Sequence, residues 1–346
     1  MSKDNTAAPK KEKDERSLVQ KFFSLNGASV FVAMIIVCIL LELILQLQGK
    51  GDGGLVFITP SNFLAIFRQQ VYVGIIAFAL TLVIITGNID LSVGYQLTFL
   101  CCVCGWVMVN YDNTLFAVAL TLVAGLGCGL LNGILVGGLK LNSFVTTLGT
   151  SSIFSALAIL VSAGTVLVIP SDCQESFQLL GQASIGGVSI LVFWFILVAV
   201  VLSLLLSRTV YGQQLYMIGA NPVAARYSGI RSGRNIAIAY TIVGLVCGLA
   251  AIITMSNVQS ANPQSASGKE MEVILCVVLG GTAVNGGKGS GWATIIGVLF
   301  YGVLSAGFTM LGLNDQLSMI AMGIIMVIVL AMDALRGRGV KLWKKK

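Results

Sequence analysis

Histidine is absent from the sequence, and charged residues make up only 10% of its 346 positions. The absence of histidine excludes Ser-His-Asp and Cys-His catalysis, histidine metal sites and a histidine pH switch. Proline is scarce, with five residues, whereas glycine occurs 40 times. This balance is typical of helices that pack closely through small residues, and not of a proline-rich disordered chain. We therefore predict neither catalytic residues nor a metal site in this chain.

The eight cysteines do not change this conclusion. All except Cys173 lie in apolar segments. Cys101 and Cys104 have the CxxC spacing of metal and redox sites, but no second pair and no histidine accompanies them. Buried free cysteines usually behave as small apolar side chains, so we interpret these as packing residues.

Apolar residues dominate the composition. The chain is 56% hydrophobic with a mean hydropathy of +0.93, which lies outside the range of soluble globular proteins. Apolar windows long enough to cross a bilayer recur along the chain and predict an all-α transmembrane helical bundle of about ten spans. The predicted spans are 28–47, 68–87, 91–110, 115–139, 144–168, 188–207, 235–257, 272–287, 291–312 and 316–334. The first run is too long for the apolar core of a signal peptide and lacks a cleavage-site pattern, so we expect it to be retained.

The basic residues are distributed unevenly along the chain. Eighteen of the 21 Lys and Arg lie in the N-terminal tail, at Lys140, in the loop 208–234, at Lys288 and in the C-terminal tail. By the positive-inside rule these regions are cytoplasmic, which predicts two cytoplasmic termini, an even number of spans, and loops 170–187 and 258–271 on the outside. The same distribution accounts for the net charge of +7 without a nucleic-acid partner.

The predicted organisation is a cytoplasmic tail of residues 1–27, a transmembrane domain of residues 28–334 and a basic cytoplasmic tail of residues 335–346. Residues 129–149 and 297–317 both run a glycine-rich apolar segment into a Leu-Asn turn. In this layout the second copy lies five spans after the first and is therefore upside down, which is the arrangement of an inverted repeat. Glycine-rich apolar helices also resemble one another by composition alone, so both explanations stay open.

The stretch TGNIDLSVGYQ places Asn88, Asp90 and Ser92 between two apolar segments. An aspartate at membrane depth is costly and usually faces a cavity or a partner group. The flanking Gly87 and Gly94 permit a helix break, whose backbone groups must then line protein or water. We predict that the three polar residues form a helix break on a translocation path. The alternative is a short cytoplasmic turn with a solvated aspartate.

The stretch VVLGGTAVNGGKGSGW gathers glycines around one lysine, as phosphate-binding loops do. A P-loop requires Gly, four residues, and then Gly-Lys-Ser/Thr. Counting back from Lys288 places Thr282 where glycine is needed and Gly289 where the hydroxyl is needed. Because the other register fails as well, we expect no nucleotide site. We predict instead a packing and helix-break element, in which Thr282 and Asn285 satisfy the interrupted helix and line the path.

The predicted cytoplasmic loop 208–234 carries four arginines and no acidic residue. Asn221 and Pro222 have the order of a helix N-cap and first turn, and Gly229 can end the helix. Small helix formers between them would let this helix lie close to a partner surface. The candidate docking residues are Gly219, Asn221, Pro222, Ala224, Ala225, Arg226, Tyr227 and Gly229. The alternative is an ordinary positive-inside loop, which explains the arginines but not the capped helix.

Four sequence blocks carry a family resemblance. They are GNIDLSVG, NSFVTTLGT, YGQQLYMIGANPVAARYSGI and ANPQSASGKEMEVILCVVLGGTAVNGGKGS. Together they resemble the ribose/galactose-type permeases, which are membrane subunits of bacterial ABC sugar importers and are related more distantly to branched-chain amino-acid permeases. The resemblance extends from about Gly87 to Asp333. In such permeases the block ANPVAARYSGI forms the cytoplasmic contact with the ATPase.

This resemblance implies a function and a set of partners. It implies a permease subunit in the bacterial inner membrane that forms the path for a simple sugar of the ribose, galactose or xylose kind. It further implies a second permease subunit, a separate cytoplasmic ATP-binding subunit, and a periplasmic or lipid-anchored sugar-binding protein. ATP would be bound by the partner, so we expect no cofactor in this chain. The alternatives are an ABC permease for nucleosides or branched-chain amino acids and an ion-coupled secondary transporter.

Overall fold

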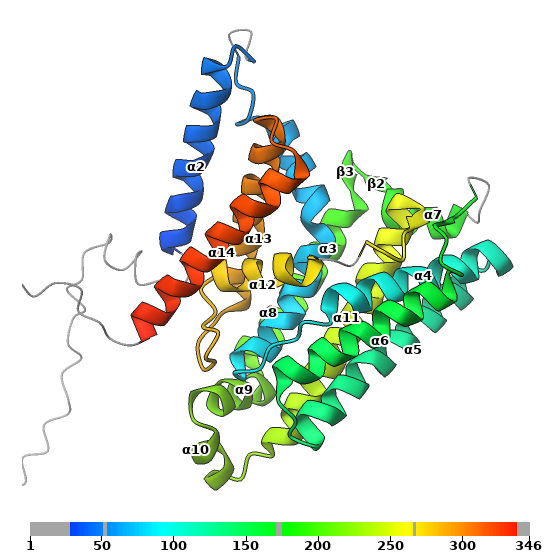
Figure 1. Ribbon diagram of the computed structural model, residues 1–346, viewed down its shortest axis with the longest axis vertical. Helices are drawn as coiled ribbons and strands as arrows, with labels where there is room; N and C mark the ends of the chain where they lie inside the picture. The colour runs from blue at the N-terminus through cyan, green and yellow to red at the C-terminus, as the bar shows by residue number, and fades with distance from the viewer. Residues whose placement is uncertain (1–27, 51–53, 171–174, 266–267, 338–346) are drawn as a thin grey trace, which may run out of the picture.

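The chain folds into an all-α helical bundle in a computed structural model, which describes residues 28–50, 54–170, 175–265 and 268–337 (Figure 1). The helices are α2 (Ala28–Leu47), α3 (Pro60–Ile85), α4 (Val93–Tyr111), α5 (Thr114–Gly133), the π-helix η1 (Ile134–Gly138), α6 (Ser143–Val161), α7 (Glu175–Gln182), α8 (Ile190–Arg208), α9 (Val210–Ala220), α10 (Pro222–Tyr227), α11 (Ser232–Val258), α12 (Lys269–Leu279), α13 (Gly291–Met310) and α14 (Asp315–Gly337). Two short antiparallel pairs complete it: β1 (Leu167–Val168) with β4 (Ser260–Ala261), and β2 (Ser184–Ile185) with β3 (Val188–Ser189).

Each of the ten predicted spans overlaps a helix, and eight of the helices in the described part are long and apolar enough to cross a membrane. The predicted span 272–287 is wrong, because α12 has only 11 residues and the chain from 280 to 290 is not helical. Gly281, Gly286 and Gly287 adopt positive φ angles of 86°, 83° and 74°, which glycine tolerates and a helix cannot contain. The last predicted span corresponds to α14, whose described apolar part covers Gln316–Ala331. The tails 1–27 and 338–346 lie outside the described residues, and the orientation stays a prediction.

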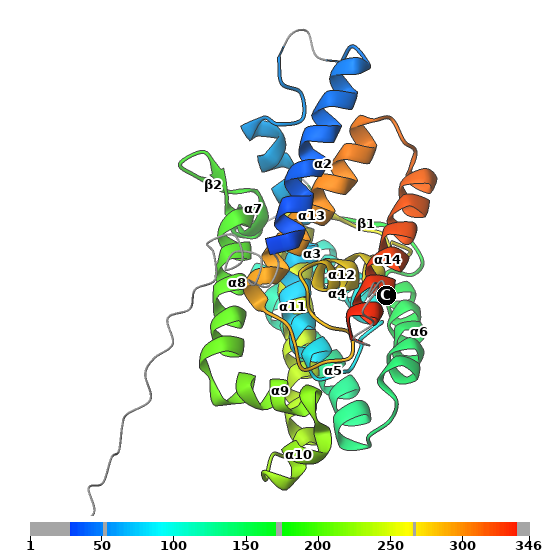
Figure 2. The ribbon, with the colours of Figure 1, turned by 90° about the vertical axis from the view of Figure 1, so that its left-hand side faces the viewer.

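Helix α3 forms the centre of the bundle. Every residue from Val73 to Ile85 is buried, and the helix contacts α8, α11, α12 and α13. A helix that is apolar on all sides is stable only when other elements surround it. By contrast, α2 lies at the outside of the bundle beside α13 (Figure 2), and many of its apolar side chains are exposed. Exposed apolar side chains on an outer helix are typical of a surface that faces lipid.

Glycines set the distance between α5 and α11. Gly125, Gly129 and Gly133 recur at every fourth residue of α5, so they share one face of the helix. A Cβ atom at Gly129 would lie 2.4 Å from the Tyr240 carbonyl oxygen, and one at Gly125 would lie 2.5 Å from the Gly244 carbonyl oxygen. Helices approach this closely only where side chains are missing, and such contacts replace the hydrophobic effect inside a membrane.

Candidate functional site: a projecting helix pair and two helix breaks

Helices α9 and α10 project from one end of the bundle in both views (Figures 1 and 2). The Asn221 side chain caps α10 by accepting hydrogen bonds from the backbone N–H groups of Val223 (3.1 Å) and Ala224 (3.0 Å). Pro222 occupies the first turn, and Gly229 follows the helix with φ +80°. The helix predicted from the Asn-Pro order is therefore present with the expected cap and end.

The exposed face of α10 differs from the sequence expectation at one residue. Ala225 is 1% exposed, so its side chain packs inside the chain and does not reach a partner. Val223 and Tyr227 are 64% and 89% exposed and lie one turn apart. Two uncovered apolar side chains on a short, rigid helix are suited to contact another protein. Ala224 and Arg226 are exposed as well.

Helix α9 is joined to the glycine-rich loop 280–290 and to the end of α3. The Tyr216 hydroxyl donates to the Gly289 carbonyl at 2.8 Å, and the Gly287 N–H donates to the Ile85 carbonyl at 2.8 Å. A Cβ atom at Gly219 would lie 1.9 Å from the Ile85 carbonyl oxygen and 2.5 Å from the Gly287 nitrogen. We call this contact of Ile85, Tyr216, Gly219 and residues 286–289 the glycine junction.

Several features keep the glycine junction compact. The Tyr216 phenol is partly buried, and this burial raises its pKa above the ordinary value. A Cβ atom on Gly286 would lie 2.6 Å from the Gly87 nitrogen, so the loop 280–290 touches the first break directly. Thr282 is buried at the inner side of this loop, whereas Asn285 is exposed. The sequence predicts the two breaks separately, and nothing in it indicates that α9 holds them together.

The break between α3 and α4 covers residues 86–92 and is built around Asp90. Its carboxylate is fully buried, and Oδ1 accepts hydrogen bonds from the Ser92 backbone N–H (2.8 Å) and hydroxyl (2.5 Å). The Ser92 Oγ accepts from Gln96 Nε2 at 2.7 Å and from Asn132 Nδ2 at 2.8 Å. The alternative of a solvated aspartate in a turn is therefore wrong. That Asp90 lies on a translocation path stays a prediction.

Neighbouring helices hold further backbone groups of this break. The Leu91 N–H donates to Thr147 Oγ1 at 3.1 Å, and the Tyr240 hydroxyl donates to the Ile89 carbonyl at 3.0 Å. Asn88 lies at the edge, where its side chain donates to Thr86 Oγ1 at 2.9 Å. Irregular backbone at membrane depth is stable only with such partners. The sequence did not single out Gln96 and Asn132, although each is an amide inside an apolar helix.

The cysteines play no part in this site. The seven cysteines in the described segments are free and buried, which agrees with their interpretation as packing residues. Cys173 lies outside the described residues. Within the described part of the chain, no three histidine, cysteine or acidic side chains form a group that could hold a metal ion.

Comparison with known proteins places this architecture in a family. Residues 62–330 match the family described as branched-chain amino acid transport system / permease component. The ribose import permease protein RbsC of Bacillus subtilis is 34% identical over 80% of this chain and 86% of the relative. The fructose import permease protein FrcC of Rhizobium meliloti is 31% identical over 92% of this chain and 89% of the relative. The autoinducer 2 import system permease protein LsrD of Klebsiella pneumoniae is 33% identical over 88% of this chain and 90% of the relative.

No solved structure matches the chain. The match to the family covers most of the transmembrane helices, from α3 to α14. The similar proteins named above are import permeases, which are transport subunits and not enzymes. This multi-pass membrane protein therefore belongs to the branched-chain amino acid transport system permease family and, within it, to the permease subunits of ABC sugar importers.

Proposed function

We propose that this chain forms the translocation path for a simple sugar in a bacterial inner membrane and is driven by ATP that a separate cytoplasmic subunit binds and hydrolyses. The observation that carries the proposal is the glycine junction, because it connects an exposed docking helix to both helix breaks. The partners would be the ATP-binding subunit, a second permease subunit, and a periplasmic or lipid-anchored sugar-binding protein.

The geometry supports a mechanical role for α9 and α10. Closure of the ATP-binding subunits would push on the exposed side chains of Val223 and Tyr227. The cap of Asn221 keeps α10 rigid, so the displacement would reach Gly219 instead of being absorbed in the loop. From there the backbone contacts lead to the end of α3 and the start of α13. Rocking of these helices would open the path alternately to each side.

The other candidate functions have less support. The family model carries a branched-chain amino acid description, whereas RbsC and FrcC are named for ribose and fructose. We therefore favour a sugar over an amino acid or a nucleoside as the substrate. An ion-coupled secondary transporter has no need of a docking helix, and the family membership argues against it.

Aspartates on the exposed face of α10 test the proposal. The full importer, assembled with its ATP-binding subunit and sugar-binding protein, would be assayed for uptake of labelled ribose and fructose and for co-purification of the ATP-binding subunit. We expect Val223→Asp and Tyr227→Asp to insert normally and to lower both readouts at least about tenfold, because a charge at the centre of an apolar contact is strongly unfavourable. Lys140→Asp, at an exposed position of another loop, is the matched control. Unchanged co-purification and uptake in both variants would contradict the docking assignment.

A further inference from the structure

Two cavities meet at the beginning of α12. The larger has a volume of about 540 Å³ and lies between α12, α13 and α14. The smaller has a volume of about 400 Å³ and lies between α3, α11, α12 and α13. Four residues line both cavities: Lys269, Glu272, Tyr301 and Ser305. The two volumes are therefore neighbours with a shared wall.

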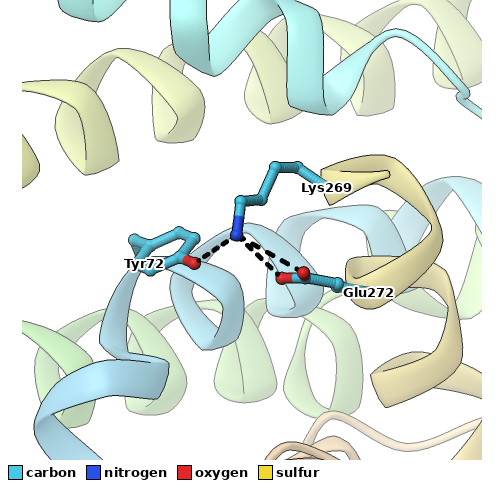
Figure 3. A network of polar contacts seen from close by, with 3 residues as sticks. All are labelled: Tyr72, Lys269 and Glu272. Atoms are coloured by element: carbon cyan, nitrogen blue, oxygen red, sulfur yellow. Dashed lines mark hydrogen bonds and ion pairs between the residues drawn. The ribbon is translucent and has the colours of Figure 1, made fainter. Parts of the chain in front are cut away.

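A charged cluster forms this shared wall. Lys269 Nζ donates to the Tyr72 hydroxyl at 3.0 Å and lies 3.3 Å and 3.4 Å from the two carboxylate oxygens of Glu272 (Figure 3). The Lys269 and Glu272 side chains are 32% and 27% exposed, so both can be reached from the cavities. We call these three residues the Lys269 cluster.

The position of α12 places the Lys269 cluster inside the bundle. The 11 residues of α12 span about 16 Å at 1.5 Å each. The C-terminal end of α12 leads into the loop of the glycine junction, so its first residues, Lys269 to Glu272, lie far from that end. In both views α12 lies in the middle of the molecule (Figures 1 and 2). An ion pair at this depth is costly and typically marks the path of a polar substrate.

A second observation indicates that the smaller cavity receives a polar ligand. Gln70 lines this cavity and is 7% exposed, and its Oε1 atom has no hydrogen-bond partner among the described residues. A buried amide oxygen without a partner is unfavourable unless another group donates to it. The remaining lining includes Thr254 and Asn257, which can both donate and accept. The cavity therefore offers both hydrogen-bond donors and hydrogen-bond acceptors.

We propose that the Lys269 cluster, with Gln70, is a subsite that binds the hydroxyl groups of a sugar in transit. Its ion pair separates the two cavities, which the sugar would occupy one after the other. This inference rests on the proposed function. A sugar hydroxyl both donates and accepts, so it can bind the carboxylate of Glu272, the ammonium of Lys269 and the free oxygen of Gln70. The ion pair is only partly buried and borders both cavities, so sugar hydroxyls can compete for its two partners and release again.

Selectivity of transport tests this subsite. The full importer would be assayed with whichever of ribose and fructose it transports faster, and with the monodeoxy derivatives of that sugar. A site that binds a hydroxyl discriminates against the analogue lacking it. In Lys269→Met and Glu272→Gln we expect the maximum uptake rate to fall about tenfold and the ratio of parent sugar to deoxy sugar uptake to fall toward one. ATP hydrolysis stimulated by the sugar-binding protein should be retained, because the glycine junction is intact.

Matched variants separate this role from a structural one. Lys269→Arg keeps the charge and should retain most of the selectivity, and Lys140→Met should behave like the unchanged importer. Tyr72→Phe removes only a hydroxyl and should still lower the selectivity ratio. If the charge variants fail to insert into the membrane, this variant distinguishes sugar binding from a structural role. An unchanged ratio in Tyr72→Phe and in each charge variant that inserts would overturn the inference, whether or not the rates fall. If the unchanged importer transports leucine and no sugar, the proposed function itself fails, which is a different result.

Discussion

Asp90 lies inside the bundle without a basic partner among the described hydrogen bonds and ion pairs. Its Oδ1 atom binds the Ser92 N–H and hydroxyl, and the amides of Gln96 and Asn132 reach the same hydroxyl. By accepting these hydrogen bonds, the carboxylate of Asp90 holds the non-helical backbone of residues 86–92 in one conformation. The same reasoning applies to Glu42 in α2, whose two oxygens accept the N–H groups of residues 56–58 at 2.8–2.9 Å.

At the residue scale, two substitutions of Asp90 distinguish an acceptor from a proton carrier. Asp90→Asn keeps one acceptor oxygen for Ser92 and should retain partial uptake. Asp90→Leu leaves the buried Ser92 N–H unpaired, which costs about 1–3 kcal/mol, so thermal unfolding in detergent should occur at a clearly lower temperature. Equal stability and full uptake in both variants would show that the network is dispensable. Proton-dependent uptake abolished by Asp90→Asn would favour an ion-coupled transporter.

Helix packing is decided by where glycines fall on each helix. In α5 the buried glycines face α11, whereas Gly127 is exposed, and a Cβ atom added there would have no neighbouring atom within 4 Å. Two glycines of the same helix therefore have different tolerance to a side chain. The 40 glycines of the sequence are not equivalent, and only those at close contacts constrain the fold.

At the element scale, Gly129→Val and Gly127→Val form a matched pair. The valine at 129 would meet the Tyr240 carbonyl and must push α5 and α11 apart, so we expect a loss of about 1–3 kcal/mol or failure to insert. A Cβ atom at 127 meets nothing within 4 Å, so Gly127→Val should leave the unfolding temperature close to that of the parent. Expression level and thermal unfolding measure both. Equal behaviour of the two variants would mean that the α5–α11 contact does not limit stability.

The glycine junction connects parts that lie far apart in the sequence. It joins the end of α3, the C-terminal part of α9 and the loop before α13 through backbone contacts (Figure 1). Because the contacts are between backbone atoms, a side chain at Gly219 would separate all three segments. In the proposed mechanism, docking of a partner on α10 and transmission of its movement would therefore depend on different residues.

At the scale of the whole molecule, Gly219→Val should uncouple these two steps. Co-purification of the ATP-binding subunit should persist, because Val223 and Tyr227 are unchanged, whereas sugar uptake per ATP hydrolysed should fall about tenfold. Met217→Val, at a half-exposed position of the same helix, is the control and should transport normally. Normal uptake in Gly219→Val would show that force does not pass through the junction.

The orientation of the bundle is a second prediction at this scale. With two cytoplasmic termini, a cysteine at Ser228 should react with a membrane-impermeant thiol reagent only after the cytoplasmic face is opened. A cysteine at Ser184, in the predicted outside loop, should react in intact cells. Both positions are exposed, and the seven cysteines in the described segments are buried, so Cys173→Ser is the suitable background. Labelling of Ser228→Cys from the outside would reverse the orientation.

The sequence by itself determined the elements of this protein that depend on local chemistry. Long apolar runs favour membrane helices. Asn221-Pro222 followed by Gly229 sets the cap, first turn and end of α10 wherever that helix lies. Family membership also follows from sequence, since the matching residues extend from 62 to 330.

Only the tertiary structure decided which of these elements touch. The bond of Asn132 to Ser92 beside Asp90 and the meeting of Lys269 with Tyr72 join residues of different helices, and no local pattern encodes these distances or the burial of Ala225. The predicted span 272–287 failed for the same reason. Its apolar residues satisfy a hydropathy window, but α12 ends at Leu279, Gly281 has a positive φ angle, and Gly286 and Gly287 lie against the ends of α3 and α9 instead of continuing the helix.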